Sequence, residues 1–532
     1  MGDNKFKLFI YYPIVLAMVL AGGIFLGAKL NAGFSPGVML DSSTGSSKKI
    51  SNLLNYVEEE YVDTVDLDGL TESAIINMLD QLDPHSSYIP ARELESTNDP
   101  LNGNFDGIGV EFNIISDTIV VVAPITGGPS EKLGIRSGDR IVTIEDSLIA
   151  GIGITNKDVI SMLRGERGTK VKVEIYRRGE QDLIPFSIKR DKIPIYSVDT
   201  GYMVEDGIGY IKISRFGAKT YDEFLEKLDK LKSDGMNSLI LDLRGNPGGY
   251  LNAAINICDE FLEDEKLIVY TEGRARPKES AYATGGGDFE KGNVVVLVDE
   301  GSASASEIVS GAVQDNDRGT IIGRRTFGKG LVQEQVELTD GSAVRLTIAR
   351  YYTPTGRCIQ RPYGEDEDYY GDFYNRLENG ELYEEDSIQV DEQRRFTTPN
   401  GKVVYGGGGI MPDVFVSVDT TGYTKFHTDL IRSGALREYS LNYSTNNSAV
   451  FDSYETASAF KSNFNFSAAD YKDLIEFAEK KDLETEDAAE GKEDVLRNLK
   501  ALVARSKWNG EGFYPIINEG DKMIEAALDE LR

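Results

Sequence analysis

Residues 294–313 read VVVLVDEGSASASEIVSGAV, and this stretch decides how the centre of the chain folds. An apolar run typical of a buried strand is followed by small residues and then by a helical pattern that begins near Ser304. Strands that alternate with helices predict an α/β layered domain. The same alternation continues on both sides, with expected strands at 208–213, 238–243, 333–338 and 343–352 and expected helices at 221–232 and 251–262.

The junction between this strand and this helix is also the first candidate for chemistry. A serine hydroxyl at the start of a helix lies where free backbone N–H groups and the helix dipole stabilise an oxyanion, as acyl transfer requires. Ser304 is therefore a candidate nucleophile, and the N–H of Ala305 is a candidate oxyanion donor. On this segment alone, a serine-rich helix N-cap explains the pattern equally well.

Lys329 lies between two glycines in the otherwise apolar stretch 327–333. A lysine with its ordinary pKa of about 10.4 keeps its proton at neutral pH, but burial disfavours the charged form and lowers that pKa. A buried Lys329 is therefore a candidate general base. Gln333 is a candidate to orient its amine. Because four residues of straight strand span about 13 Å, that role requires the chain to bend here.

A second strand is expected to end in residues 242–249, which read DLRGNPGG. Glycines at a strand end let backbone N–H groups approach a ligand closely, so Gly248 or Gly249 is a candidate second oxyanion donor. The same sequence is also typical of a simple tight turn.

Histidine-based catalysis and metal chemistry have little support in the sequence. His85 and His427 are the only two histidines, and this number excludes a zinc site built on several histidines. Neither histidine lies in a recognisable catalytic motif. A Ser-x-x-Lys sequence at 46–49 falls in an expected tether, where no pocket can form. Lys329 is followed by glycine, unlike the lysine of a phosphate-binding loop. We expect neither a metal nor another cofactor.

The composition restricts the partners and the thiol chemistry. The chain has 88 acidic against 57 basic residues, and its net charge of −31 would repel a phosphate backbone, so nucleic acid is not an expected partner. Cys258 and Cys358 match no metal-ligand spacing and form either one disulfide or two free thiols. We favour free thiols, because Cys258 falls in an apolar helical pattern.

At 532 residues the chain is too long for one hydrophobic core. Its uncharged segment Leu8–Ala28, flanked by lysines, is long enough to cross a bilayer, and we favour an uncleaved anchor over a signal peptide. Basic residues before it predict a cytoplasmic N-terminus, which makes the rest extracytoplasmic, in the periplasm. The expected regions are an anchor (1–30), a flexible tether (31–49), a helical region (50–103), a β-rich module (104–192), the α/β core (193–420) and a helical region (421–532).

Six motifs occur in order along residues 50–414: LDPHSSY (82–88), the module with Gly138-Asp139, LRGNPGG (243–249), SASE (304–307), FGKG (327–330) with Gln333, and YYTPTG (351–356). In this combination the chain resembles the carboxyl-terminal processing proteases, also called tail-specific proteases, a family of serine peptidases. The resemblance implies that Ser304 is the nucleophile, Lys329 the general base and Gln333 its orienting partner. It also implies a crotonase-like protease core with a PDZ domain inserted before it.

The residues of the β-rich module support the PDZ interpretation. An extended peptide can add as a strand beside residues 108–112, with its C-terminal carboxylate held by the loop Gly107-Ile108-Gly109 and its backbone beside Val110. A pocket between this strand and the expected helix 156–164 would suit a small or apolar last side chain. A plain hairpin turn is the alternative explanation for the glycines.

These observations together predict a membrane-anchored serine endopeptidase that recognises accessible protein C-termini outside the cytoplasm. The alternative is a catalytically silent PDZ scaffold or adaptor that binds tails without cutting them. The C-terminal helices 468–480, 488–503 and 521–531 suggest an interaction segment, and with it a homodimer or larger oligomer.

Overall fold

The structure, a computed structural model, describes residues 45–364, 368–422 and 424–532. It divides into two compact units, residues up to Asn77 and residues from Met78 onward. The first unit contains α2 (Gly45–Glu60) and most of α3 (Leu67–Asp80). The predicted tether extends to Lys49, whereas α2 begins at Gly45, because serines and lysines are tolerated in a helix and leave its start weakly marked.

The predicted membrane anchor, Leu8–Ala28, and residues 31–44 of the predicted tether lie outside the described residues. Within the described parts of the chain, no helix combines the length and the apolar character needed to cross a membrane.

The α/β core is built on a six-stranded sheet with the order β10-β11-β12-β15-β16-β21. β10 pairs antiparallel with β11, and the other neighbours are parallel. The bounds are β10 (Val198–Glu205), β11 (Ile208–Ile213), β12 (Ser238–Asp242), β15 (Asn293–Val298), β16 (Thr320–Gly323) and β21 (Val414–Phe415).

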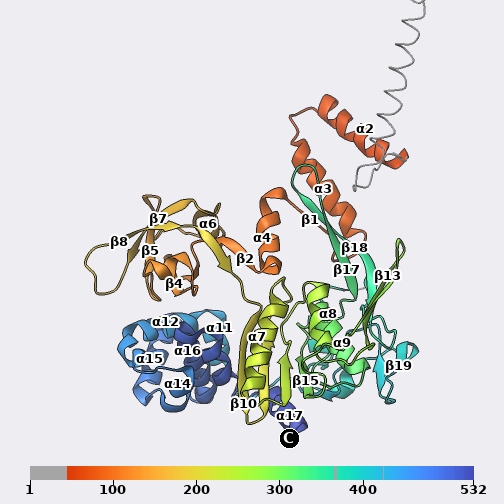
Figure 1. Cartoon of the computed structure of the whole chain (residues 1–532). Helices are drawn as coiled ribbons and strands as arrows, with labels where there is room; N and C mark the ends of the chain where they lie inside the picture. The colour runs from red at the N-terminus through yellow and green to blue at the C-terminus, as the bar shows by residue number, and fades with distance from the viewer. Residues whose placement is uncertain (1–44, 365–367, 423) are drawn as a thin grey trace, which may run out of the picture. The chain divides into compact units, whose positions relative to one another are not determined.

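Helices cover both faces of this sheet, and the interiors of its central strands β12 and β15 are therefore apolar, as in other parallel sheets. Val296 of β15 packs against the helices of one face, and the next residue, Leu297, packs against the helix of the other. The helices of the first face are α7 (Thr220–Ser233), α8 (Leu251–Asp259) and α9 (Ala305–Asp315), and that of the second is α17 (Lys522–Leu531) (Figure 1).

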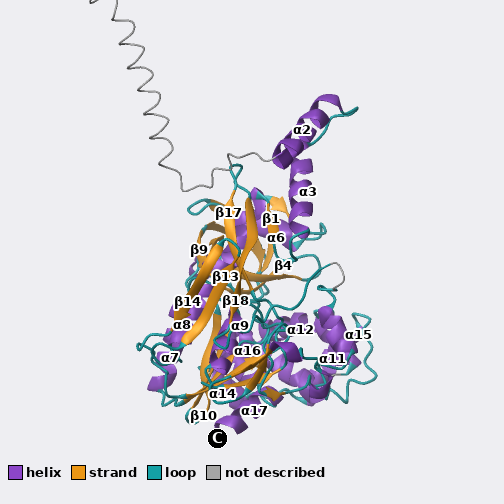
Figure 2. Ribbon diagram, turned by 90° about the vertical axis from the view of Figure 1, so that its right-hand side faces the viewer, coloured by secondary structure: helices purple, strands orange, loops and turns teal. Residues whose placement is uncertain are grey.

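A second, antiparallel sheet brings distant motifs together. β18 pairs with β17 along one edge and with β1 and β13 along the other, and β14 follows β13 (Figure 2). β1 belongs to the LDPHSSY motif, so this motif lies one strand away from the lysine-bearing segment. The bounds are β1 (Ser87–Ile89), β13 (Leu267–Gly273), β14 (Arg276–Tyr282), β17 (Leu331–Glu337) and β18 (Ala343–Tyr352).

The β-rich module has its own hydrophobic core and a sheet with the order β3-β4-β5-β7-β8, in which β6 also pairs with β5. β2 and β9 pair with each other where the chain enters and leaves the module. The bounds are α4 (Ala91–Asn102), β2 (Asn104–Gly107), β3 (Val110–Ile114), β4 (Ile119–Pro124), α5 (Pro129–Lys132), β5 (Arg140–Ile144), β6 (Ser147–Leu148), α6 (Asn156–Leu163), β7 (Lys170–Tyr176), β8 (Ile184–Lys189) and β9 (Asp191–Pro194).

The C-terminal helices form a separate core rich in aromatic side chains, including Phe460 and Phe464 stacked 4.7 Å apart. Leu441 of this region also packs against Ile115 and Val120 of the β-rich module. The bounds are α11 (Lys425–Arg432), α12 (Ala435–Asn446), α13 (Ser448–Asp452), α14 (Ala457–Asn463), α15 (Ala468–Glu479) and α16 (Lys492–Ile517). The remaining elements are α10 (Asp372–Glu378), two short 3₁₀ helices (Glu385–Ser387 and Glu392–Arg394), β19 (Arg395–Thr397) and β20 (Val403–Tyr405).

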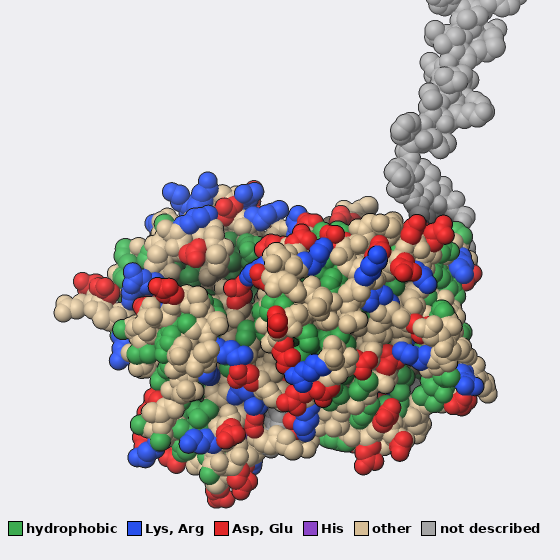
Figure 3. Space-filling model, turned by 60° about the horizontal axis from the view of Figure 1, so that its bottom comes forward, with side chains coloured by type: hydrophobic (Ala, Val, Ile, Leu, Met, Phe, Trp, Pro, Cys, Tyr) green, Lys and Arg blue, Asp and Glu red, His purple; other side chains and the backbone are tan. Residues whose placement is uncertain are grey.

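Both cysteines are free thiols, as favoured from the sequence, and Cys258 packs in the main core. On the face drawn in Figure 3, acidic and basic side chains are interspersed rather than separated by sign.

Candidate active site

Ser304 lies immediately before α9, at the predicted junction of strand and helix. Its backbone has φ 54° and ψ −110°, a conformation that residues other than glycine rarely adopt. The residue is half-buried and lines a cavity of about 980 Å³. Among the described residues, the N–H of Ala305 has no acceptor, as expected for the first turn of a helix. The junction thus places a cavity-lining serine directly before a helix-start N–H group that has no acceptor among the described residues.

Lys329 and Gln333 line the same cavity, and Nζ of Lys329 donates to Oε1 of Gln333 at 3.0 Å. The bend that this contact requires is present. Gly328 has φ 89°, β17 begins only at Leu331, and the β17–β18 register shifts between Val332 and Gln333. Burial, followed by the charge of Arg345, lowers the pKa of Lys329 below its ordinary value.

The carbonyl of His85 holds the other end of Gln333, whose Nε2 donates to it at 2.6 Å. This backbone contact fixes which amide atom faces Lys329. The imidazole Nε2 lies 2.6 Å from the hydroxyl of Tyr369, and burial lowers the pKa of His85 to about 4. His427 is buried in α11, beside Asn498. Neither ring is hydrogen-bonded to Ser304 in the described structure.

Glu307 joins the serine segment to the lysine segment, a role that the sequence alone does not reveal. Its buried carboxylate accepts the N–H groups of Ser304 (2.8 Å), Gly328 (2.7 Å) and Lys329 (2.9 Å) and the hydroxyl of Thr326 (2.6 Å). Burial raises the pKa of Glu307 to about 7, while all four donors favour its ionised form. The only sequence signal was its position three residues after Ser304, as in a capping box.

Tyr351 makes a second connection between the same two segments. Its hydroxyl lies 3.1 Å from the carbonyl oxygen of Ser304 and 2.6 Å from that of Lys329. The backbones on both sides of the cavity are therefore held together by one carboxylate and one phenol, although they are separated along the chain.

The glycine loop after β12 lies directly against Ser304. A Cβ atom at Gly248, which has φ 96°, would be 2.8 Å from Cβ of Ser304 and 2.9 Å from N of Ala305, so only glycine allows this approach. The N–H of Gly248 donates to Oδ1 of Asn246 at 2.8 Å. The N–H of Gly249 has no acceptor among the described residues. Gly248 thus lies against Ser304 and Ala305, but of the three predicted oxyanion donors only the N–H groups of Ala305 and Gly249 have no acceptor among the described residues.

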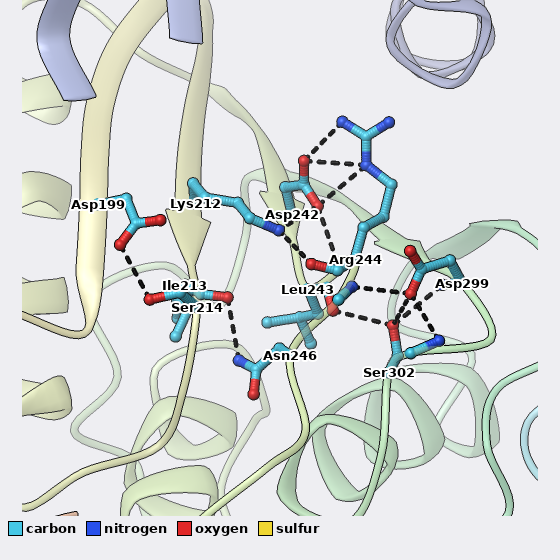
Figure 4. A network of polar contacts seen from close by, with 12 residues as sticks. Asp199, Lys212, Ile213, Ser214, Asp242, Leu243, Arg244, Asn246, Asp299 and Ser302 are labelled. Carbon is cyan, nitrogen blue, oxygen red and sulfur yellow. Dashed lines mark hydrogen bonds and ion pairs between the residues drawn. The ribbon is translucent and has the colours of Figure 1, made fainter. Parts of the chain in front are cut away.

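A buried polar network supports this loop from behind (Figure 4). Nζ of Lys212 lies 3.0 Å from Oδ1 of Asp242, and the guanidinium of Arg244 also binds this carboxylate. Arg244 reaches further, to Asp521 at the start of α17. The network thus connects the strand ends of the core sheet with the C-terminal helix.

The other side of the loop is tied to the segment before Ser304. The N–H of Gly245 donates to Oδ1 of Asp299 at 2.8 Å, and Oγ of Ser302 donates to the carbonyl of Leu243 at 2.8 Å (Figure 4). Nδ2 of Asn246 donates to the carbonyl of Ile213 at 3.0 Å. The first two of these bonds hold the glycine loop against the segment before Ser304.

The predicted peptide-binding residues lie on an edge of the β-rich module. Gly107 ends β2 and Val110 begins β3, and among the described strands β4 is the only neighbour of β3. Ile108 and Gly109 between them are buried, yet their N–H groups have no acceptor in the described residues. Buried, unused donors next to an unpaired strand edge form a candidate site for a peptide carboxylate.

The pattern of Peptidase family S41 matches residues 207–370, that of the PDZ domain matches residues 107–188, and Family of unknown function (DUF8443) matches residues 426–509. The carboxy-terminal-processing protease of Bartonella bacilliformis is 37% identical over 346 residues, which is 64% of this chain and 78% of that protein. The carboxy-terminal processing protease CtpA of Bacillus subtilis is 34% identical over 360 residues, 67% of this chain and 76% of that protein. The solved photosystem II D1 C-terminal processing protease aligns over 70% of this chain and 87% of its own, with 28% identity and a TM-score of 0.37.

Proposed function

This chain belongs to the carboxy-terminal processing proteases of peptidase family S41, a family of serine-type peptidases, and carries a PDZ domain, and we propose that Ser304 and Lys329 are its catalytic dyad. One observation above all supports this. The two residues line one cavity, and the backbones that carry them share the buried carboxylate of Glu307. Gln333 orients the amine of Lys329, and the core is of the crotonase-like type.

In this mechanism the neutral amine of Lys329 takes the proton from Oγ of Ser304 as the oxygen attacks the carbonyl carbon of the peptide bond. The N–H groups of Ala305 and Gly249, which have no acceptor among the described residues, donate to the developing oxyanion. The ammonium of Lys329 then gives its proton to the leaving nitrogen, and the C–N bond breaks. Water hydrolyses the acyl-enzyme, with Lys329 again as the base.

The PDZ domain selects substrates by their C-terminus. The substrate tail adds as a strand to the free edge of β3, and its carboxylate accepts from the N–H groups of Ile108 and Gly109. The strand break between Gly107 and Val110 supports this arrangement, because it leaves these buried donors without a backbone acceptor at the start of the unpaired edge of β3.

The setting of the enzyme is part of the same proposal and rests on the sequence. The segment Leu8–Ala28 anchors the protein in the cell membrane with the catalytic part in the periplasm or its equivalent. Its substrates are then secreted, membrane-bound or partly unfolded proteins with accessible C-termini. Assembly into a homodimer or a larger oligomer would be mediated by the C-terminal helices.

The proposal is tested with the full chain and a protein substrate that has a free C-terminus. Ser304→Ala and Lys329→Ala should each abolish cleavage while the protein still binds a C-terminal peptide, and amidation of that peptide should weaken its binding. Retained cleavage in both variants would refute the dyad. A wild-type protein that binds tails but cuts no substrate would favour the scaffold alternative.

A further inference from the structure

Arg345 lies in the cleft beside the dyad and has no role in the mechanism above. It is on β18, opposite Gln335 of β17 in the strand register, and it lines the same cavity as Ser304 and Lys329. Its side chain is half-buried. The guanidinium is therefore positioned to meet whatever peptide occupies the cleft.

The groups around Arg345 leave its charge uncompensated. Nη2 donates to Oδ1 of Asn98 at 3.3 Å and to Oε1 of Gln335 at 3.1 Å, and both acceptors are neutral amides. No carboxylate of the described residues lies within ion-pair distance of it. By contrast, Arg325 and Arg361, whose side chains are largely buried, each pair with a carboxylate.

The lack of a carboxylate partner for Arg345 among the described residues is unexpected in a chain with 88 acidic and 57 basic residues. The charged residues lining the cavity are Lys329, Arg345 and Glu337, the last at the exposed end of β17. When Lys329 is neutral, as its role as a base requires, Arg345 is the remaining cation of this lining. A half-buried cation is costly unless a partner compensates it, and such a partner can come with the substrate.

We propose that Arg345 forms a subsite for a carboxylate group of the bound substrate, in particular the side chain of Asp or Glu near the cleaved bond. The planar guanidinium matches a carboxylate with two parallel hydrogen bonds, and its Nε and Nη1 donors are not engaged by the described residues. This inference rests on the proposed protease function. It adds a preference for substrates with Asp or Glu close to the cleaved peptide bond.

A second effect of Arg345 must be separated from binding. Its charge also lowers the pKa of Lys329, so a variant would change the rate for every peptide alike. A subsite, however, changes the rates of acidic and neutral peptides unequally. The ratio of kcat/KM between two matched peptides cancels the common effect and isolates the subsite.

The experiment uses the full chain and pairs of quenched fluorescent peptides that differ only by Glu or Gln, placed in turn at each position around the cut. The wild type should cleave one Glu peptide about tenfold faster in kcat/KM than its Gln partner, as for a partly buried charge pair. Arg345→Gln should reduce this ratio to about one. Arg350→Gln, on the same strand but outside the cavity lining, should keep the wild-type ratio.

Two further arms make the result decisive. Arg345→Glu should reverse the preference toward a Lys peptide, which shows a folded, altered subsite. Amidation of the peptide C-terminus distinguishes a side-chain carboxylate from the carboxylate of the chain end. If Arg345 binds the side chain of Glu, the preference for the Glu peptide should survive amidation. If amidation instead slows cleavage by the wild type but not by Arg345→Gln, Arg345 binds the C-terminal carboxylate and the side-chain subsite is wrong.

The subsite would be overturned if the wild type cleaved every Glu peptide and its Gln partner at the same rate, and if amidation did not change the ratio of kcat/KM between the wild type and Arg345→Gln. Cleavage that still depends on Ser304 would uphold the proposed function in that case. A wild type without any cleavage would overturn both.

Discussion

Nη1 of Arg244 lies 2.6 Å from Oδ2 of Asp521, although 277 positions separate the two residues in the sequence. This pair connects α17 with the loop that carries Gly248. It also balances charge, because the cations of Lys212 and Arg244 share the single buried carboxylate of Asp242 and Asp521 supplies a second one. The C-terminal helix therefore contributes to the support of the cleft.

Replacing Asp521 with asparagine removes this balancing charge but keeps a helix cap, since Asn caps a helix as well as Asp does. The free energy of unfolding should fall by roughly 1–3 kcal/mol, less than for a fully buried pair, because the two side chains are 19% and 22% exposed. Urea titration measures this change. Asp529→Asn, at an exposed position of the same helix, is the control and should have little effect. An unaltered unfolding curve for Asp521→Asn would rule out a stabilising contribution.

Glu307→Gln replaces a carboxylate that accepts four hydrogen bonds with an amide that brings its own donor against them. Ser304 and Lys329 should then lose their relative placement, and kcat should fall roughly 100-fold, since misplacement by about 1 Å has an effect of this size. Binding of a C-terminal peptide to the PDZ domain should not change. Steady-state kinetics and calorimetry measure the two quantities. Glu334→Gln, exposed on β17, is the matched control, and a wild-type kcat in Glu307→Gln would contradict the role of the carboxylate.

Cleavage should increase with pH through the lowered pKa of Lys329, because only the neutral amine accepts a proton. Arg345 helps to lower this pKa, whereas Asp83 and Glu307 oppose the effect. Arg345→Gln should therefore raise the pKa of Lys329 and move the rising limb of kcat/KM to higher pH. His85, with a pKa of about 4, is already neutral there. Arg350→Gln is the control and should leave the pH profile of kcat/KM unchanged. An unchanged pH profile in Arg345→Gln would refute the electrostatic coupling between Arg345 and Lys329.

Two variants of Gln333 separate orientation from charge. Gln333→Ala removes the acceptor 3.0 Å from Nζ of Lys329 and should lower kcat by roughly 10 to 100-fold with little change in KM. Gln333→Glu keeps an acceptor but adds a negative charge, which stabilises the ammonium and should move the pH profile to higher pH. Rates measured from pH 5 to about 10 test both expectations. Equal profiles for the two variants would show that the side chain does not act on the amine.

Local patterns predicted the regular elements of the core well. The expected strands 208–213 and 343–352 match β11 and β18 to the residue, because each is rich in apolar, aromatic and β-branched residues and is bounded by turn residues. The bend between Lys329 and Gln333 also followed from strand geometry, once Gln333 was taken to contact the amine of Lys329. These features depend on short stretches of sequence, so a single chain is enough to reveal them.

Long-range contacts could not be predicted in this way. The carboxylate of Glu307, the hydroxyl of Tyr351 and the carbonyl of His85 act on residues from other segments, and nothing in their local sequence names those partners. The same holds for α17, which the sequence predicts only as a C-terminal helix at 521–531. Its place on the core sheet depends on which apolar face remains uncovered, a property of the whole fold.

The strained backbone at Ser304 links the thermal stability of the protein with its proposed catalytic role. Its φ of 54° is comfortable for glycine but strained for serine, a difference of order 1–3 kcal/mol. An inert Ser304→Gly protein should therefore survive heating better than the working enzyme, and better than Ser304→Ala, which keeps the strain. Stability alone would favour glycine at position 304, so a serine in this strained conformation supports its proposed role as the nucleophile.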